Sequence, residues 1–166
     1  MSLENKNLRI ILGALFILLF LVPMTLHVVT KPWRAHVLFF PEMSTGRLVG
    51  ERRFLPRRTE LTSRIELYVQ ELVLGPSNPL LTRVVPRDVL LHSVIERQGS
   101  VYVSLSREIL EFQPDVPLSF EQTLQTVANG VLFNFPEVRN LYLLVEGQVP
   151  GEKYGEGFVF DKKLLK

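Results

Sequence analysis

Residues 66–86 read ELYVQELVLGPSNPLLTRVVP and pass from a helical pattern into a long loop. The first half continues an apolar stripe with spacings of three and four residues, which is the spacing of one helix face. Gly75 stands where a glycine commonly follows a helix, and Pro76 cannot continue the helix. The segment from Pro76 to Pro86 is therefore predicted to be a loop that leads to a strand. It carries no obvious catalytic group, so its length needs another explanation.

Two helices are predicted, and Thr59 suits the N-cap of the first, with Glu60 in its first turn. The apolar stripe of this helix consists of Leu61, Ile65, Tyr68, Val69, Leu72 and Val73. Ser119 and Gln122 have the spacing of a capping box at the start of the second helix. Its inner stripe consists of Phe120, Leu124, Val127, Val131 and Phe135. Gly130 is unfavourable inside a helix and is expected to mark close packing against the sheet.

Five β-prone segments are predicted as strands, at residues 36–41, 47–56, 89–96, 100–106 and 138–147. Short turns, EMSTG and RQG, join the first four into two hairpins. The last segment is apolar on both faces in places, as a central strand would be. The order β-β-α-β-β-α-β predicts an α+β domain, a small two-layer sandwich with the strands in one layer and two helices in the other. The tail, residues 150–166, fits a linker, an added edge strand or an arm that docks on a neighbour.

The N-terminal segment LRIILGALFILLFLVPMTLHVV, residues 8–29, is almost wholly apolar. As a helix it would reach roughly 33 Å, enough to cross a bilayer core of about 30 Å. A cleaved signal peptide and a buried core helix are the alternatives, but no A-x-A-like cleavage site follows. Cationic residues flank both ends, so charge barely indicates the orientation, and N-in, C-out is the default for a signal anchor. The expected organisation is a flank at 1–7, a transmembrane helix at 8–29, a domain at 35–149 and a tail at 150–166. The domain is expected on the outer, periplasmic side of the cytoplasmic (inner) membrane.

Composition narrows the classes of function. The chain has 166 residues, of which 46% are hydrophobic and 22% charged, as in ordinary globular proteins. Its formal net charge of +2 is too small to indicate nucleic-acid binding. Because there is no cysteine, disulfides, thiolate metal sites, thiol catalysis and a lipid-modified cysteine are excluded.

Motifs for catalysis are equally scarce. The sequence has no GxSxG elbow, and GPSNP lacks the lysine and spacing of a phosphate-binding loop. The histidines, His27, His36 and His92, have no metal-ligand spacing. Scattered carboxylates leave a glycosidase pair open, with no other feature to support it. We therefore expect no enzyme, and the sequence gives no reason to expect a cofactor, a metal, a nucleic acid or a small-molecule substrate.

Two segments are candidate interfaces. The densest charge run, RRFLPRR at residues 52–58, fits contact with anionic lipid head groups or an acidic partner, or simply a solvated strand end. The loop at residues 76–86 contains two leucines that either tuck under the domain's own sheet or touch a neighbouring protein. The candidate interface residues are Arg52, Arg53, Arg57, Arg58, Pro76, Leu80 and Leu81.

A series of short motifs then occurs in order: LFFPE, GRLVGERR, ELVLGP, VVPRDVLLHSV, GSVYVSLS and NFPEVRNLYLLVEG. In this order and spacing, Val37 to Gly147 resembles the GerMN domain, found in sporulation and spore-germination proteins and in some bacterial envelope lipoproteins. Three features depart from the family pattern. Ser104 replaces the usual aspartate, only one copy is present, and the anchor is a helix rather than a lipid-modified cysteine.

The resemblance implies a non-enzymatic, envelope-facing assembly domain. GerMN domains look similar to the ring-building modules of secretion and flagellar basal-body proteins, which pack side by side through a helix–sheet interface. We therefore expect a membrane-anchored scaffold or interaction subunit of a bacterial envelope assembly, ring-forming machines of the secretion, flagellar or sporulation type among them. Its partners would be the membrane and other envelope proteins or copies of itself. The alternative is a module that binds an envelope ligand such as peptidoglycan glycan.

Overall fold

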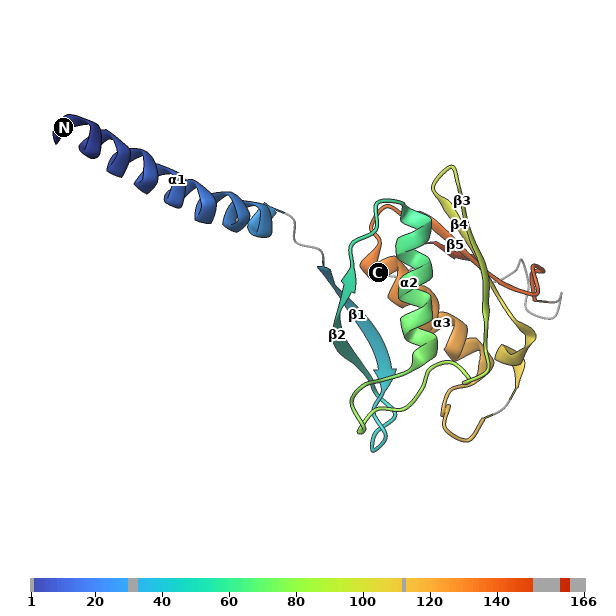
Figure 1. Ribbon diagram of the computed structural model, residues 1–166. Coiled ribbons are helices and arrows are strands. Elements are labelled where there is room, and N and C mark those ends of the chain that lie inside the picture. Colours follow the sequence, from blue (N-terminus) through green and yellow to red (C-terminus); the bar gives the residue numbers. More distant parts are fainter. Residues whose placement is uncertain (1, 30–32, 112, 151–158, 162–166) are drawn as a thin grey trace. The chain divides into compact units, whose positions relative to one another are not determined.

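The computed structural model of the chain describes residues 2–29, 33–111, 113–150 and 159–161. Two compact units make up the chain, Met1–Arg34 and Ala35–Lys166. The first unit is dominated by helix α1 (Ser2–Val29), which therefore includes most of the flank expected at residues 1–7 (Figure 1). Its side chains are described for residues 12–25, all of them exposed. Among the residues that the structure describes, no helix is long and apolar enough to cross a membrane.

The second unit confirms the expected α+β class and the expected order of strands and helices. The elements from the start of β1 onward are β1 (Trp33–Pro41), β2 (Leu48–Pro56), α2 (Leu61–Leu74), β3 (Leu91–Arg97), β4 (Ser100–Leu105), η1 (Arg107–Leu110), α3 (Phe120–Asn134), β5 (Asn140–Val145) and β6 (Val159–Asp161). The short 3-10 helix η1 and the strand β6 were not among the predicted elements. Three residues of the tail thus form an added strand, while residues 151–158 and 162–166 lie outside the described part.

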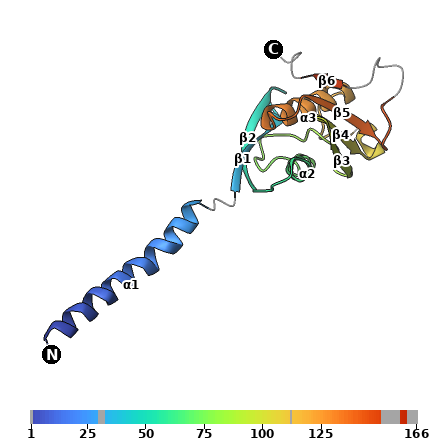
Figure 2. The same cartoon turned by 90° about the horizontal axis from the view of Figure 1, so that it is seen from above.

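The strands do not share one layer, which corrects the two-layer sandwich. They form a two-stranded sheet, β1-β2, and a four-stranded sheet, β3-β4-β5-β6. Figures 1 and 2 show α2 and α3 lying between the two sheets. The physical reason is that α3 is buried on more than one side. In α3 the buried residues extend well beyond the expected stripe and are Thr123, Leu124, Thr126, Val127, Ala128, Gly130, Val131 and Leu132.

The four-stranded sheet combines a hairpin with a crossover. Strands β3 and β4 pair antiparallel, and the residues of their turn, Gln98 and Gly99, have φ of 55° and 79°, as a tight hairpin turn requires. Strands β4 and β5 are parallel, so the chain between them crosses over through η1 and α3. Because β6 pairs with the other edge of β5, the prediction that the last predicted strand is central is confirmed.

The helix ends explain two differences from the sequence prediction. The capping box of α3 is confirmed, since Ser119 Oγ accepts from Gln122 N at 3.2 Å and Gln122 Oε1 accepts from Ser119 N at 2.9 Å. The N-cap of α2 is Glu60 rather than Thr59, and its carbonyl accepts from Arg64 N at 3.1 Å. Gly130 packs against the Tyr68 hydroxyl of α2, where an added Cβ would collide, and not against a sheet. Close approach of the two helices therefore explains this glycine.

Candidate functional site

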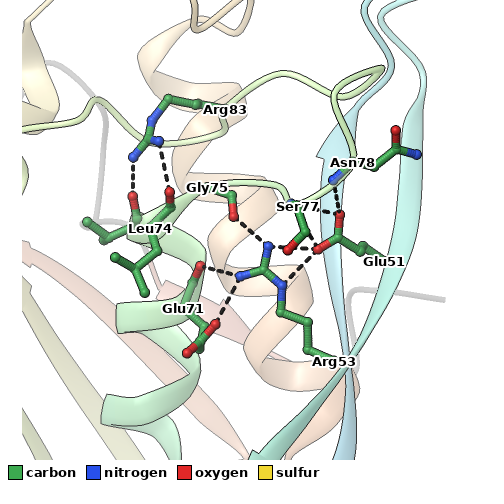
Figure 3. Close-up of polar contacts among 9 residues, drawn as sticks. Glu51, Arg53, Glu71, Leu74, Gly75, Ser77, Asn78 and Arg83 are labelled. Atoms are coloured by element: carbon green, nitrogen blue, oxygen red, sulfur yellow. Dashed lines mark hydrogen bonds and ion pairs between the residues drawn. The ribbon is translucent and has the colours of Figure 1, made fainter.

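The end of α2 presents backbone carbonyls that have no partner within the helix, as every helix end does. Two arginines from outside the helix satisfy them (Figure 3). Arg83 donates to the carbonyls of Leu74, at 2.9 Å, and Val73. Arg53 donates to the carbonyls of Glu71 and Gly75 at 3.2 and 2.6 Å. Cationic donors suit this position because the C-terminal end of a helix carries partial negative charge.

Arg53 is also an ion-pair centre. Its guanidinium lies 2.7 Å from Glu51 Oε1 and 2.9 Å from Glu71 Oε2, and its side chain is only 13% exposed. Glu51 in turn accepts from the backbone amides of Ser77 and Asn78, both at 3.1 Å (Figure 3). Burial by itself raises the pKa of Glu51, but the hydrogen bonds from Arg53, Asn78 and Ser77 outweigh it and lower that pKa below its ordinary value. The contact therefore joins β2, the end of α2 and the loop that follows.

The loop after α2 is tied to the β1–β2 turn as well. Met43 N donates to Leu80 O at 2.9 Å, and Thr82 N donates to Pro41 O at 2.8 Å. Glu42 and Leu81 form an isolated antiparallel bridge between these two bonds. Hydrogen bonds thus hold the loop at its start, through Ser77 and Asn78, and at its middle, through Leu80, Thr82 and Arg83. These bonds explain how a loop of this length keeps one conformation.

The two leucines of the loop differ in burial. Leu81 is 8% exposed and belongs to the hydrophobic core, so it tucks under its own domain. Leu80 is 67% exposed and lies beside Met43, which is 66% exposed and belongs to the β1–β2 turn. We call Met43 and Leu80 the loop tip. Pro76, at the start of the loop, is half-buried.

The four arginines of the charge run, residues 52–58, also differ in exposure and in their contacts. Arg53 points into the contacts just described, whereas Arg52, Arg57 and Arg58 are exposed. Among the described residues, the side chains of these three arginines have no hydrogen-bond or ion-pair partner. The seven candidate residues therefore do not form one surface. Pro76, Leu80 and Leu81 belong to the loop, and Arg53 of β2 contacts Gly75, just before that loop. Arg52, Arg57 and Arg58 form a separate group at the end of β2.

Sequence reasoning missed three residues that hold the loop, Glu51, Glu71 and Arg83. A signal for the first was present, since period 2 places Glu51, Arg53 and Leu55 on the inner face of β2. Arg83 gave no such signal, because its partners depend on how the loop folds back.

Other polar residues of the domain have structural surroundings. His36 is 9% exposed and packs against the rings of Tyr68 and Phe135, and His92 lies 3.8 Å from Glu146. The side chain of His27 is outside the described residues. Ser104 is buried, and its Oγ accepts from Gly147 N at 2.9 Å. Within the part of the chain that is described, no three His, Cys, Asp or Glu side chains gather as metal ligands would.

Comparison with known proteins points to one family. The family model described as "Germane: Sporulation and spore germination" matches residues 37–150. The tandem GerMN domains of the sporulation protein GerM from Bacillus subtilis are similar in structure, with a TM-score of 0.52 and 16% identity over 71% of this chain and 40% of that chain. The first GerMN domain of the same protein gives a TM-score of 0.50 and 17% identity over 69% of this chain and 84% of that chain. The chain thus spans less than half of the tandem structure, and at these identities the likeness shows the fold alone. No curated protein matches the chain.

Proposed function

The chain belongs to the Germane family of sporulation and spore-germination domains, and we propose that it is a non-enzymatic scaffold or interaction subunit of a bacterial envelope assembly. Residues 8–29 would anchor it in the cytoplasmic membrane, with the domain on the outer side. The apolar sequence of that segment supports the anchor. Partners would be other envelope proteins or further copies of this chain, and a ring is one form that such an assembly would take.

The observation that carries the proposal is that the loop tip is exposed while hydrogen bonds hold the loop behind it. Met43 and Leu80 are each about two-thirds exposed. This exposure is unfavourable, because the free energy falls when large apolar side chains leave water. The loop behind them is fixed by Arg53 and Arg83. A preformed apolar contact loses little conformational entropy on binding, which favours association with another protein. The long loop at residues 76–86 would therefore support a protein–protein contact.

The test is purification of the full chain from its native membrane in gentle detergent, followed by mass spectrometry and particle sizing. We expect the wild-type chain to elute in a large particle with defined partners. The Met43→Ser/Leu80→Ser variant should shift to a small particle, because the apolar contact is lost. The matched control is Leu90→Ser/Leu110→Ser, which removes two leucines that are 64% and 57% exposed elsewhere on the domain.

Two results would contradict the proposal. If the wild-type chain elutes as a small particle without partners, it is not a scaffold subunit. Equal losses for the loop-tip variant and the leucine control would move the contact away from the loop tip.

A second candidate, glycan binding, has one observation in its favour. Tyr102 and Tyr142 are opposite each other on β4 and β5, with ring centroids 4.6 Å apart and planes within 12°. They alternate with the buried residues of these strands, so they lie on the sheet face away from the core. Because the two rings stack on each other, it is their edges and hydroxyl groups that can contact and hydrogen-bond a sugar. Retention of the full chain on purified peptidoglycan, abolished in Tyr102→Ala/Tyr142→Ala, would put this function first.

A further inference from the structure

We propose that the end of β2 and the residues after it bind the anionic head groups of a lipid bilayer. This surface, the basic strip, consists of Arg52, Phe54, Arg57 and Arg58. The inference deepens the proposed function, on which it rests, because it takes residues 8–29 as the anchor and assigns the side of the domain that meets the same membrane.

The positive charge of the basic strip is not neutralised by the domain. Glu51 and Glu71 are both paired with Arg53, which points inward between them. Glu60, two residues after Arg58, is exposed and forms no ion pair with the strip among the described residues. Arg52, Arg57 and Arg58 lie on the outside, and in the described part of the chain their guanidinium groups have no partner. Three free arginines within seven residues favour an anionic surface as the partner.

Phe54 distinguishes a lipid surface from a purely acidic one. It is 65% exposed, whereas the next residue, Leu55, is 3% exposed. Strand alternation places Phe54 on the same face as Arg52. An arginine pairs with a lipid phosphate while an adjacent aromatic ring enters the apolar region beneath the head groups. An acidic protein would satisfy the charges but would leave the exposed ring without an apolar partner.

The basic strip lies at the end of the β1–β2 hairpin that follows the proposed anchor segment in the chain. Strands β1 and β2 form a hairpin whose turn is closed by Glu42 N donating to Arg47 O at 2.9 Å. The other end of the hairpin therefore contains the start of β1, at Trp33, and the end of β2, at Pro56 (Figure 1). In the sequence, only residues 30–32 separate Val29, where α1 ends, from Trp33, where β1 begins. The basic strip thus belongs to the end of the hairpin that is nearest in the chain to the proposed anchor segment.

The experiment uses the absence of cysteine from the chain. A single spin label at Pro56→Cys, an exposed position next to the strip, leaves all four strip residues in place. The full chain is reconstituted in vesicles of phosphatidylcholine, with or without one-third phosphatidylglycerol. Collisions of the label with a water-soluble nickel complex then report whether this site is covered by lipid. A second label at Leu15→Cys reports separately on the anchor.

We expect the label at position 56 to be shielded from nickel in the vesicles with phosphatidylglycerol and open in phosphatidylcholine alone. Each arginine near an anionic surface strengthens binding roughly fivefold, so three provide on the order of a hundredfold. Arg52→Gln/Arg57→Gln/Arg58→Gln should abolish the shielding, and Phe54→Ser should weaken it. Arg47→Gln/Arg97→Gln/Arg139→Gln, with the same change of charge at other exposed arginines, should preserve it.

The contrary results separate the two proposals. If the label at position 15 is in the bilayer while position 56 stays open to nickel in anionic vesicles, lipid binding by the strip is wrong and the anchor stands. A label at position 15 that stays in water overturns the anchor itself. Equal shielding in both lipids overturns the role of charge. Shielding that occurs only in native membranes, and is lost when their proteins are removed, assigns the strip to an acidic protein instead.

Discussion

Arg52 and Arg53 are adjacent in the sequence but have opposite surroundings, which makes them a matched pair. Arg53 bonds two carboxylates and two carbonyls, whereas Arg52 is exposed. We predict that Arg53→Met lowers the free energy of unfolding by about 2–4 kcal/mol, because it leaves partly buried carboxylates without their cation. Arg52→Met should change it by no more than about 0.5 kcal/mol. Urea unfolding of both variants measures the difference, and equal effects would show that the Arg53 contacts do not stabilise the domain.

Because of Tyr68, the free energy of unfolding is expected to depend on pH in the alkaline range. Burial raises the pKa of its phenol above the ordinary value, and the neighbouring Asn134 side chain offsets only part of this effect. The unfolded chain ionises at about pH 10, so above that pH the folded state holds more protons and the free energy of unfolding decreases as pH rises. Tyr68→Phe should flatten this decrease, while costing about 1 kcal/mol at neutral pH through the lost bond to Val37 O. Urea unfolding between pH 8 and 11 checks it.

At the scale of elements, the contact between α2 and α3 depends on Gly130. A Cβ at this position would collide with the Tyr68 hydroxyl. Gly130→Ala should therefore destabilise the domain by about 1–3 kcal/mol, although alanine is intrinsically better in a helix by about 1 kcal/mol. In Gly130→Ala/Tyr68→Phe the clashing oxygen is gone, so the two effects should be less than additive by at least about 0.5 kcal/mol. A double-mutant cycle by thermal or urea unfolding measures this coupling, and strict additivity would contradict the steric explanation.

The elements themselves could be predicted from sequence because their signals are local. Helix spacing, the capping box at Ser119 and the turn before β4 each depend on residues close together in the chain. The division into two sheets could not be predicted, because no local pattern says which strand a given edge will pair with. The site shows the same limit. Alternation along β2 separates Arg52 from Arg53, but the return of Arg83 to the end of α2 depends on tertiary contacts.

At the scale of the domain, the helices serve as a layer between two sheets, and the Asn134 side chain of α3 forms hydrogen bonds with the smaller sheet. Asn134 Oδ1 accepts from Val37 N at 2.9 Å, and its Nδ2 donates to Val37 O at 2.7 Å. This amide takes the place that a neighbouring strand would have at the edge of β1. It satisfies backbone groups that would otherwise be open to another chain. The pairing explains in part why the hairpin remains separate from the four-stranded sheet.

We predict that Asn134→Ala loosens the hairpin without unfolding the rest of the domain. Val37 N loses its acceptor, whereas Val37 O keeps the hydroxyl of Tyr68 at 3.2 Å. The expected loss is about 1–3 kcal/mol, and it should increase hydrogen exchange at Val37 while the amides of β4 and β5 stay protected. Asn129→Ala is the matched control on the same helix, since its side chain bonds only Gln125 on the exposed face among the described residues. Unchanged exchange at Val37, or an equal effect of Asn129→Ala, would mean that burial of Leu38 and Phe40 alone holds the hairpin on the helices. Selective exchange would instead establish that the polar contact sets the edge of β1, and hence the separation of the two sheets.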